Sequence, residues 1–436
     1  MRTAAAFFLA ALLGFLPAPV RGGDEAPWRL GGEPHAFTLD NGLSVILQQD
    51  ETAPITVAQL LVRGGDRDDP PGMPGLSYLA ARLSLEITED SKLQQLMDLG
   101  SSYSLSAAGD YSLVTIRSLS RHFSATLAVL AAMISEPLVS DLRVDGVKDL
   151  MRHLQKMEAE DPDSFMRKTL AGVFYDAPAY GAARFGDEAS LARIGRKDIQ
   201  SFLRGHYVAG NMTLVVISDL GEAEIRPLLA SRLGVIAAGT RPSPPPVPLR
   251  RPAQPALSVE RQTAQVLVSL SVQLPELNAG NFILASLLES WLGKGIGSRL
   301  WQLRSRGGLA YGVNAEVQPN REAMLLSVSL KTDARRSAGA QAELERIMGE
   351  VGSSGISAPE LEAAKAYARA DFWRENETRE RRAATLAFLE GSGLSYRLGG
   401  SFTRRLDEIG LEEFNAFLRT WLAPARWFIL RIGPVQ

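Results

Sequence analysis

The chain has 436 residues, of which 45% are hydrophobic and 22% are charged, and its formal net charge is −2. This length predicts two domains or one large duplicated domain with a sizeable core. The balanced charge argues against nucleic-acid binding, which usually shows as a basic patch. The lack of cysteine excludes disulfides, thiolate nucleophiles, cysteine zinc ligands and a lipidated cysteine.

The N-terminus has the pattern of a secretory signal peptide. Arg2 precedes an uncharged apolar run from Ala4 to Leu16, which prolines and the small residue Gly22 follow. A membrane-spanning helix needs about 20 apolar residues, so residues 1–22 are expected to be cleaved rather than to anchor the chain. No other long apolar stretch occurs, and we expect no membrane span after cleavage. The short signal and the lack of cysteine suit a protein secreted into the bacterial periplasm.

Residues 33–236 are expected to form a first domain in which strands and helices are grouped. Period-2 and helical patterns identify its elements. They are strands at 42–49 and 56–65, helices at 75–86 and 124–136, and a buried strand at 212–218.

A proline-rich linker over residues 237–257 separates this domain from a second one over residues 258–436. The segment TRPSPPPVPLRRPAQP is typical of a semi-rigid extended linker. After it we expect a strand at 267–274 and a helix at 281–293, ended by Gly293. The fold class predicted for both domains is α+β, each with a largely antiparallel sheet packed with helices.

The two halves resemble each other. A single offset places GSSYSLSA of the first half over GLAYGVNA of the second, and each segment is preceded by a helical pattern and followed by an alternating strand. The matching residues are Gln94, Gly100, Tyr103 and Ala107 with Gln302, Gly308, Tyr311 and Ala315. This order predicts an internal duplication.

The histidines do not indicate a metal site. The chain has four, namely His35, His122, His153 and His206, and no two of them have the i, i+4 spacing of a helical metal pair. A mononuclear zinc site typically needs three protein ligands. Each histidine is therefore interpreted as a surface or packing residue.

Five segments together resemble the pitrilysin/insulinase family of zinc peptidases, in the family's order and over nearly the whole mature chain. They are LDNGLSVIL at 39–47, LVRGGDRDDPPGMPGLSYLAARL at 61–83, APAYGAARFG at 177–186, FLRGHYVAGNMTLVVISDL at 202–220 and GKGIGSRLWQLRSRGGLAYGVNA at 293–315. The resemblance implies two homologous domains that form half of a clamshell.

The residues that bind zinc in this family are replaced. The family carries H-x-x-E-H on a helix, with two histidine ligands and a glutamate base. At the matching positions this chain has Ser77, Ala80 and Ala81. A hydroxyl and two methyl groups can neither hold zinc nor abstract a proton, so no metal is expected in this chain. The distal glutamate ligand aligns near Leu154, while Glu158 and Glu160 are interpreted as a solvated helix face.

Two further family residues are retained. Arg304 and Tyr311 match the arginine–tyrosine pair that the family uses to hold substrate and to donate to the developing oxyanion. The alternative is that Tyr311 packs on a sheet and Arg304 lies on a solvated helix face. Arg306 is a nearby candidate for the same role, whereas Arg299 is interpreted as structural.

The glycines Gly293, Gly295 and Gly297 resemble a glycine-rich loop with which some non-catalytic family subunits handle substrate. Their alternative role is to end one helix and begin the next.

Two functions remain open at this point. The first is a catalytically inactive subunit of a heterodimeric zinc peptidase. Its partner would be an H-x-x-E-H chain of similar length, which would hold the zinc. The two chains would bind a peptide substrate together. The second is a zinc-free scaffold or peptide-binding protein of the cell envelope, possibly homodimeric. An independent hydrolase using Ser77 is disfavoured, because no G-x-S-x-G elbow surrounds that serine.

Overall fold

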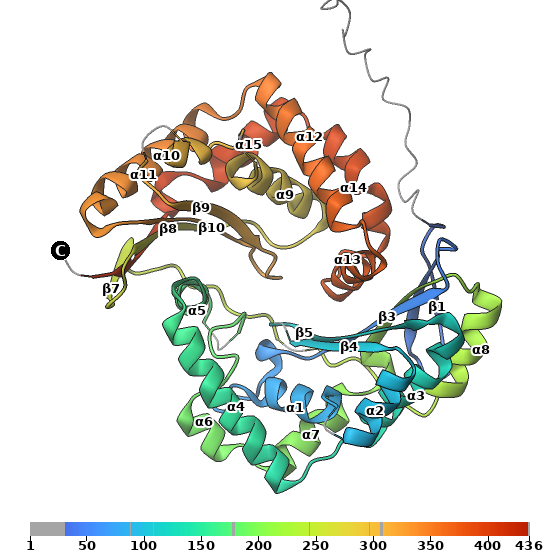
Figure 1. Cartoon of the computed structure of the whole chain (residues 1–436). Coiled ribbons are helices and arrows are strands. Elements are labelled where there is room, and N and C mark those ends of the chain that lie inside the picture. Colours follow the sequence, from blue (N-terminus) through green and yellow to red (C-terminus); the bar gives the residue numbers. More distant parts are fainter. Residues whose placement is uncertain are drawn as a thin grey trace, which may run out of the picture.

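The computed structural model describes residues 31–87, 89–107, 109–176, 179–243, 245–295, 297–305 and 308–434. The expected signal peptide, residues 1–22, lies outside these ranges. The described chain forms two lobes, each a sheet with helices on its outer side, and the two sheets face each other (Figure 1).

The first lobe contains a six-stranded sheet in the order β1-β2-β6-β3-β5-β4. Only β2 and β6 pair in parallel; the other pairs are antiparallel. The apolar run of β6 is buried at every position because the strand is central. The strands are β1 His35–Thr38, β2 Ser44–Gln49, β3 Ile55–Arg63, β4 Ser102–Ala107, β5 Tyr111–Leu119 and β6 Met212–Ser218.

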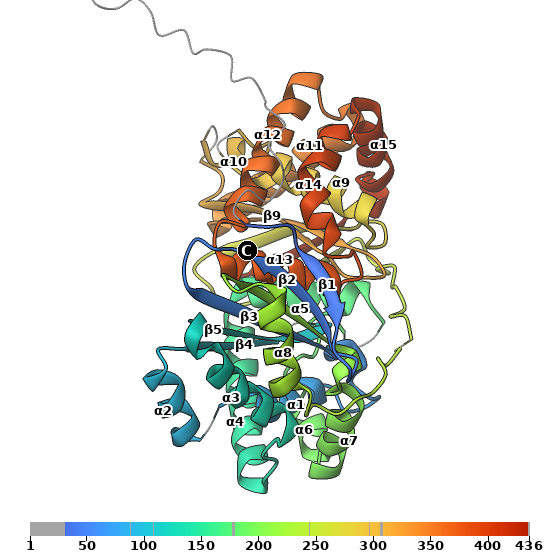
Figure 2. The ribbon, with the colours of Figure 1, turned by 90° about the vertical axis from the view of Figure 1, so that its right-hand side faces the viewer.

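Helices of the first lobe pack mainly on the outer face of this sheet (Figures 1 and 2). Their caps fit the local sequence: Asp161 and Asp187, for example, accept backbone N–H groups at the starts of α5 and α6. The helices are α1 Leu76–Leu85, α2 Asp90–Asp98, α3 Phe123–Ser135, α4 Asp141–Glu160, α5 Pro162–Phe174, α6 Glu188–Arg193, α7 Arg196–His206 and α8 Glu222–Leu233.

The second lobe contains a five-stranded sheet in the order β7-β11-β8-β10-β9. Here too one pair, β7 with β11, is parallel. The strands are β7 Ala256–Glu260, β8 Val266–Gln273, β9 Gly312–Gln318, β10 Leu325–Thr332 and β11 Phe428–Gly433. The helices are α9 Ala279–Gly293, α10 Trp301–Ser305, α11 Ser337–Ser354, α12 Ala358–Glu375, α13 Arg379–Gly391, α14 Arg397–Glu408 and α15 Leu411–Trp421.

The two sheets repeat one topology. Without β1, the order β2-β6-β3-β5-β4 corresponds strand by strand to β7-β11-β8-β10-β9, and the parallel pair stands at the same place in both. The predicted α+β class and internal duplication are thereby confirmed.

The proline-rich segment is fastened to the first lobe. The backbone N–H of Asp176 donates to Pro248 at 2.8 Å, and that of Arg250 donates to Phe174 at 2.8 Å. Its end differs from the expected linker over 237–257, because β7 already begins at Ala256. Pairing with β11 gives those last residues hydrogen-bond partners that a free linker lacks.

Each lobe places one helix on the inner face of the other lobe's sheet. Helix α13 packs on β3 and β6, where Leu386 and Ala387 join a core with strand residues of the first lobe such as Leu61. Conversely, α5 of the first lobe packs on β8 and β11, where Leu170 meets Leu430. The two lobes therefore share their inner cores.

No helix in the described ranges is both long enough and apolar enough to cross a membrane.

Candidate functional site

The degenerate zinc motif lies inside the first lobe. Ser77, Ala80 and Ala81 on α1 are 3%, 0% and 0% exposed, and Ala80 belongs to the main apolar core of the lobe. Gly75 precedes the first residue of the helix, and its φ of +91° suits glycine. The small side chains at these positions are buried and present no ligands.

Asp69 anchors the start of this helix. Its two carboxylate oxygens accept the backbone N–H groups of Gly75 at 2.6 Å and Ser77 at 2.7 Å. Burial raises the pKa of Asp69 to about 7, although these two backbone hydrogen bonds favour its ionised form. These hydrogen bonds from the backbone fix the start of α1, the helix that corresponds to the motif helix of the family.

The distal ligand region also lacks a free carboxylate at the expected place. Leu154 on α4 is half-buried, and Glu158 one turn later is paired with Lys168 at 2.8 Å. Glu160 at the end of α4 is exposed. Across the described ranges, no group of three or more histidine, aspartate or glutamate side chains is placed to hold a metal ion. The residues at the family's zinc position therefore do not fit zinc.

The histidines lie apart from one another. His35 contacts Glu222 at 2.8 Å, and the Nε2 of His122 accepts from Arg121 at 3.1 Å. His206 stacks on Phe202 with ring centroids 4.0 Å apart, and His153 is exposed on α4.

Arg304 and Tyr311 both reach solvent. Arg304 is exposed on the short helix α10, and its guanidinium carbon lies 5.1 Å from the centre of the Trp301 ring. Tyr311 is 59% exposed, and its backbone N–H donates to Lys331 at 2.8 Å just before β9 begins. The backbone fixes the place of Tyr311, while its ring remains available to another molecule. Arg306 lies outside the described residues.

Gly293, at the end of α9, and Gly295 and Gly297, just after it, have different surroundings. A Cβ on Gly293 would lie 2.7 Å from the Cβ of Ala315, and a Cβ on Gly295, whose φ is +82°, would lie 2.5 Å from the Tyr367 ring. Within the described part of the chain, no atom beyond the chain neighbours of Gly297 lies within 4 Å of such a Cβ. Packing therefore accounts for two of the glycines but not for Gly297.

Arg299, in the same segment, makes intramolecular contacts. Its guanidinium lies 3.6 Å from Glu350 and 3.6 Å from Glu360, on two different helices. These contacts join the segment to α11 and to the start of α12.

A cleft of about 650 Å³ lies between the lobes. Residues of α4, α5 and the 180–185 segment line one side, and the end of β9 and α13 line the other. Both acidic and basic groups reach it, including Glu158, Arg167, Lys168 and Glu316. A cleft of this size and mixed polarity can hold several residues of an extended peptide.

Two carboxyl groups with raised pKa values, the buried Asp66 and the half-buried Asp110, lie beside this cleft. Asp66 accepts the N–H of Gly181 at 2.8 Å and lies 3.6 Å from Arg184, yet burial raises its pKa to about 6. Burial likewise raises the pKa of Asp110 to about 6. Arg67, which follows Asp66, donates to Glu322 of the second lobe at 3.0 Å. The sequence analysis did not predict this group of charged side chains. The run of four charged residues between the glycines and prolines of 64–72 could have indicated it.

Two family profiles match consecutive parts of the chain. The profile described as Insulinase (Peptidase family M16) matches residues 44–186, and the profile described as Peptidase M16 inactive domain matches residues 193–367.

Relatives of similar length agree with the two profiles. A protein named as an uncharacterised zinc protease, from Mycobacterium tuberculosis, is 24% identical over 410 residues, which cover 92% of this chain and 93% of that protein. A non-peptidase homolog, YmxG of Helicobacter pylori, is 21% identical over 381 residues, covering 86% of this chain and 88% of that protein.

A solved structure shows the same fold. The crystal structure of a peptidase M16 inactive domain from Pseudomonas fluorescens has a TM-score of 0.83 and 21% identity, and the match covers 93% of this chain and 98% of that one. The profiles, the relatives and the replaced motif lead to one conclusion: the chain belongs to the pitrilysin/insulinase (M16) peptidase family, in its non-catalytic branch.

Proposed function

We propose that the chain is the catalytically inactive subunit of a heterodimeric zinc peptidase of the bacterial periplasm. It closes one side of the peptide chamber and contributes Arg304 and Tyr311 to the zinc site of a partner that carries H-x-x-E-H. The observation that carries the proposal is a contrast in exposure. Tyr311 is 59% exposed, whereas Ser77, Ala80 and Ala81 are at most 3% exposed.

This contrast is what a contributing subunit requires. An exposed phenol leaves its hydroxyl free to donate to a group on another molecule. A phenol and a guanidinium reaching out of the second lobe can bind a peptide backbone or stabilise a developing oxyanion. The zinc in this scheme belongs to the partner, because this chain's own residues at the motif do not fit the ion.

The first test is isolation of the tagged mature protein from its native envelope, followed by zinc analysis and a peptide-cleavage assay. The expected result is co-purification of an H-x-x-E-H chain of similar length, with zinc and cleavage found only in the pair. A protein that comes out without such a partner, zinc-free and inert, would contradict the proposal. That result would favour the zinc-free scaffold or peptide-binding protein.

The second test separates contribution to the site from assembly. Tyr311→Phe is expected to lower kcat of the pair by about 10²-fold, the usual effect of losing one oxyanion donor, and Arg304→Ala is expected to lower it as well. Arg404→Ala, on an exposed side chain of α14, is the matched control and should leave activity unchanged. Size-exclusion chromatography checks that each variant still assembles. Full activity of both site variants in the assembled pair would exclude the contribution.

A further inference from the structure

An aromatic pocket of about 360 Å³ lies in the second lobe between α9, α12 and α14 and the helix α13, which Figure 1 shows between the two lobes. Four phenylalanine side chains line it: Phe282, Phe372, Phe388 and Phe402. Phe372 and Phe402 are stacked with ring centroids 4.6 Å apart, and Phe282 meets Phe402 edge-on at 6.3 Å. Such walls suit a flat ring or a branched apolar group.

One wall of this pocket carries an incompletely compensated acid. The carboxylate of Glu289 lies 3.6 Å from Lys294 Nζ, but that ammonium donates instead to Asp371 at 2.5 Å. Asp371 also accepts from Arg374 at 2.5 Å. Two cations therefore neutralise Asp371, whereas the ion-pair partner of Glu289 among the described residues is Lys294 at 3.6 Å.

We infer that this pocket binds a small organic cation, a protonated primary amine carried on an aromatic or branched apolar body. The apolar body packs among the four phenylalanine rings, and the ammonium donates to the carboxylate of Glu289. Glu289 is the acid that a ligand cation would pair with, because its partner Lys294 lies 3.6 Å away and donates to Asp371. The inference uses no partner chain and stands apart from the proposed subunit role.

The ionisation of Glu289 gives this site a pH dependence. Burial, opposed by Lys294 and reinforced by Glu316 and Asp371, raises the pKa of Glu289 to about 7. A protonated Glu289 attracts a cation less. Because an alkylamine stays protonated below pH of about 10, amine binding should strengthen as the pH rises through about 7.

The test is isothermal calorimetry of the full chain with 2-phenylethylamine. We expect one site with a dissociation constant of about 1 mM or tighter. Two probes serve as controls: 3-phenylpropionate keeps the ring but carries the opposite charge, and n-propylamine keeps the charge but lacks the ring. Both should bind at least about tenfold more weakly.

Variants locate the binding. Glu289→Gln keeps the shape of the side chain and should weaken binding of 2-phenylethylamine at least about tenfold. Ala384→Phe, which fills the pocket from α13, should abolish binding. Glu343→Gln, on the exposed face of α11, is the matched control and should bind as the wild type does. The inference is overturned if 2-phenylethylamine does not bind, if 3-phenylpropionate binds equally well, or if Glu289→Gln in a chain with an unchanged melting temperature binds normally.

Discussion

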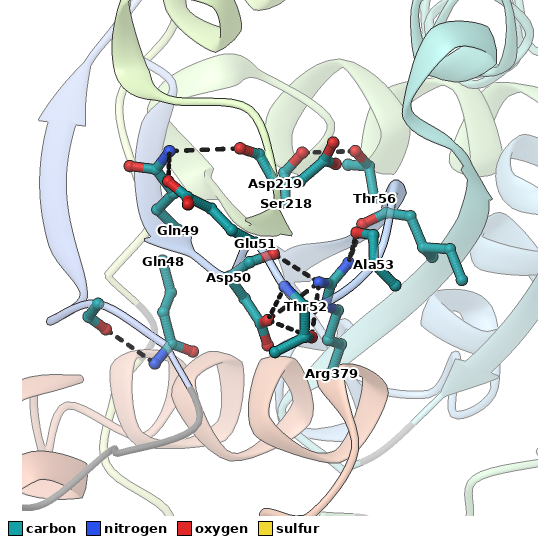
Figure 3. Close-up of polar contacts among 12 residues, drawn as sticks. Gln48, Gln49, Asp50, Glu51, Thr52, Ala53, Thr56, Ser218, Asp219 and Arg379 are labelled. Atoms are coloured by element: carbon teal, nitrogen blue, oxygen red, sulfur yellow. Dashed lines mark hydrogen bonds and ion pairs between the residues drawn. The ribbon is translucent and has the colours of Figure 1, made fainter.

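Arg379, on a helix of the second lobe, donates to the carboxylate of Asp50 at the end of β2 in the first lobe, at 3.0 Å (Figure 3). The same guanidinium also donates to the backbone carbonyl of Ala53 at 3.0 Å, and Arg382, one turn along, contacts the other oxygen of Asp50. Asp50 is 3% exposed. A buried ion pair thus joins the two lobes at the point where α13 crosses the sheet.

This pair makes Asp50 sensitive to substitution. Asp50→Asn leaves two buried guanidinium groups without their counter-charge, so the free energy of unfolding should fall by about 3–5 kcal/mol. Urea denaturation measures the change. Glu343→Gln, which removes a surface pair with Arg346, should shift the midpoint little. Equal midpoints for Asp50→Asn and the wild type would contradict a structural role for the pair.

The same pair predicts acid sensitivity. Burial alone would raise the pKa of Asp50, but hydrogen bonds from Arg379 and Thr52 lower it to about 2. The folded state therefore keeps Asp50 ionised in a range where the unfolded chain, with a pKa near 3.8, takes up a proton. Its contribution to stability is complete above about pH 4 and is lost as the pH falls toward about 2. In urea titrations over this range, Asp50→Asn should show a flatter pH dependence than the wild type.

Asp69 predicts the opposite trend near neutral pH. Its pKa is raised from 3.8 to about 7, so between these values the folded protein holds a proton that the unfolded chain has released. The stability contributed by the protonated form is present below about pH 4 and is lost as the pH rises through about 7. Asp69→Asn removes this titration. As the pH rises from 5 to 8, the denaturation midpoint of the wild type should therefore fall relative to that of the variant. A constant difference across that range would contradict the raised pKa.

Restoring the family motif should not restore zinc. Ser77→His, Ala80→Glu and Ala81→His together place large polar groups at positions that are at most 3% exposed, and Leu154 stands near the third ligand position. Overpacking and buried polar groups should cost at least about 3 kcal/mol. Calorimetry and zinc analysis of the triple variant test this expectation. One bound zinc per chain with an unchanged melting temperature would show that the site needs only these three substitutions.

The glycines after α9 offer a matched pair of variants. Gly295→Ala forces a side chain into the Tyr367 ring at a φ of +82°, and should destabilise the chain by about 1–3 kcal/mol. Gly297→Ala enters open space and should leave the melting temperature unchanged. If Gly297→Ala also lowers cleavage by an isolated pair, the effect lies in substrate handling, because the fold has no need of that glycine. Equal destabilisation by both substitutions would contradict the packing difference.

The sequence allowed the elements of each lobe to be predicted because their apolar periodicity is local. The strands near 44–49 and 212–218 and the helices near 76–85 and 279–293 could all be located from that pattern. The duplication was visible in four matching residues and in the order of elements.

The contacts between the lobes could not be predicted in this way. The apolar face of α13 indicates that the helix packs on something, but not that its partner is the sheet of the other lobe. Asp50 follows a strand and resembles a surface acid until Arg379, distant in sequence, reaches it. The aromatic pocket likewise takes its walls from four helices, so no single segment carries its pattern.

The exchange of α5 and α13 between the lobes bears on how such a chain could arise. In a half-length ancestor, no helix of the same chain would have covered the inner face of the sheet. The helix that corresponds to α5 and α13 would have had no sheet of its own to pack on. Two identical copies would have satisfied both needs by trading that helix across a twofold axis. Joining the copies in one gene then needed only a tether along the outside, which is the course that the proline-rich segment takes. After fusion the two copies could diverge in sequence, because each exchanged helix was then held by the chain itself.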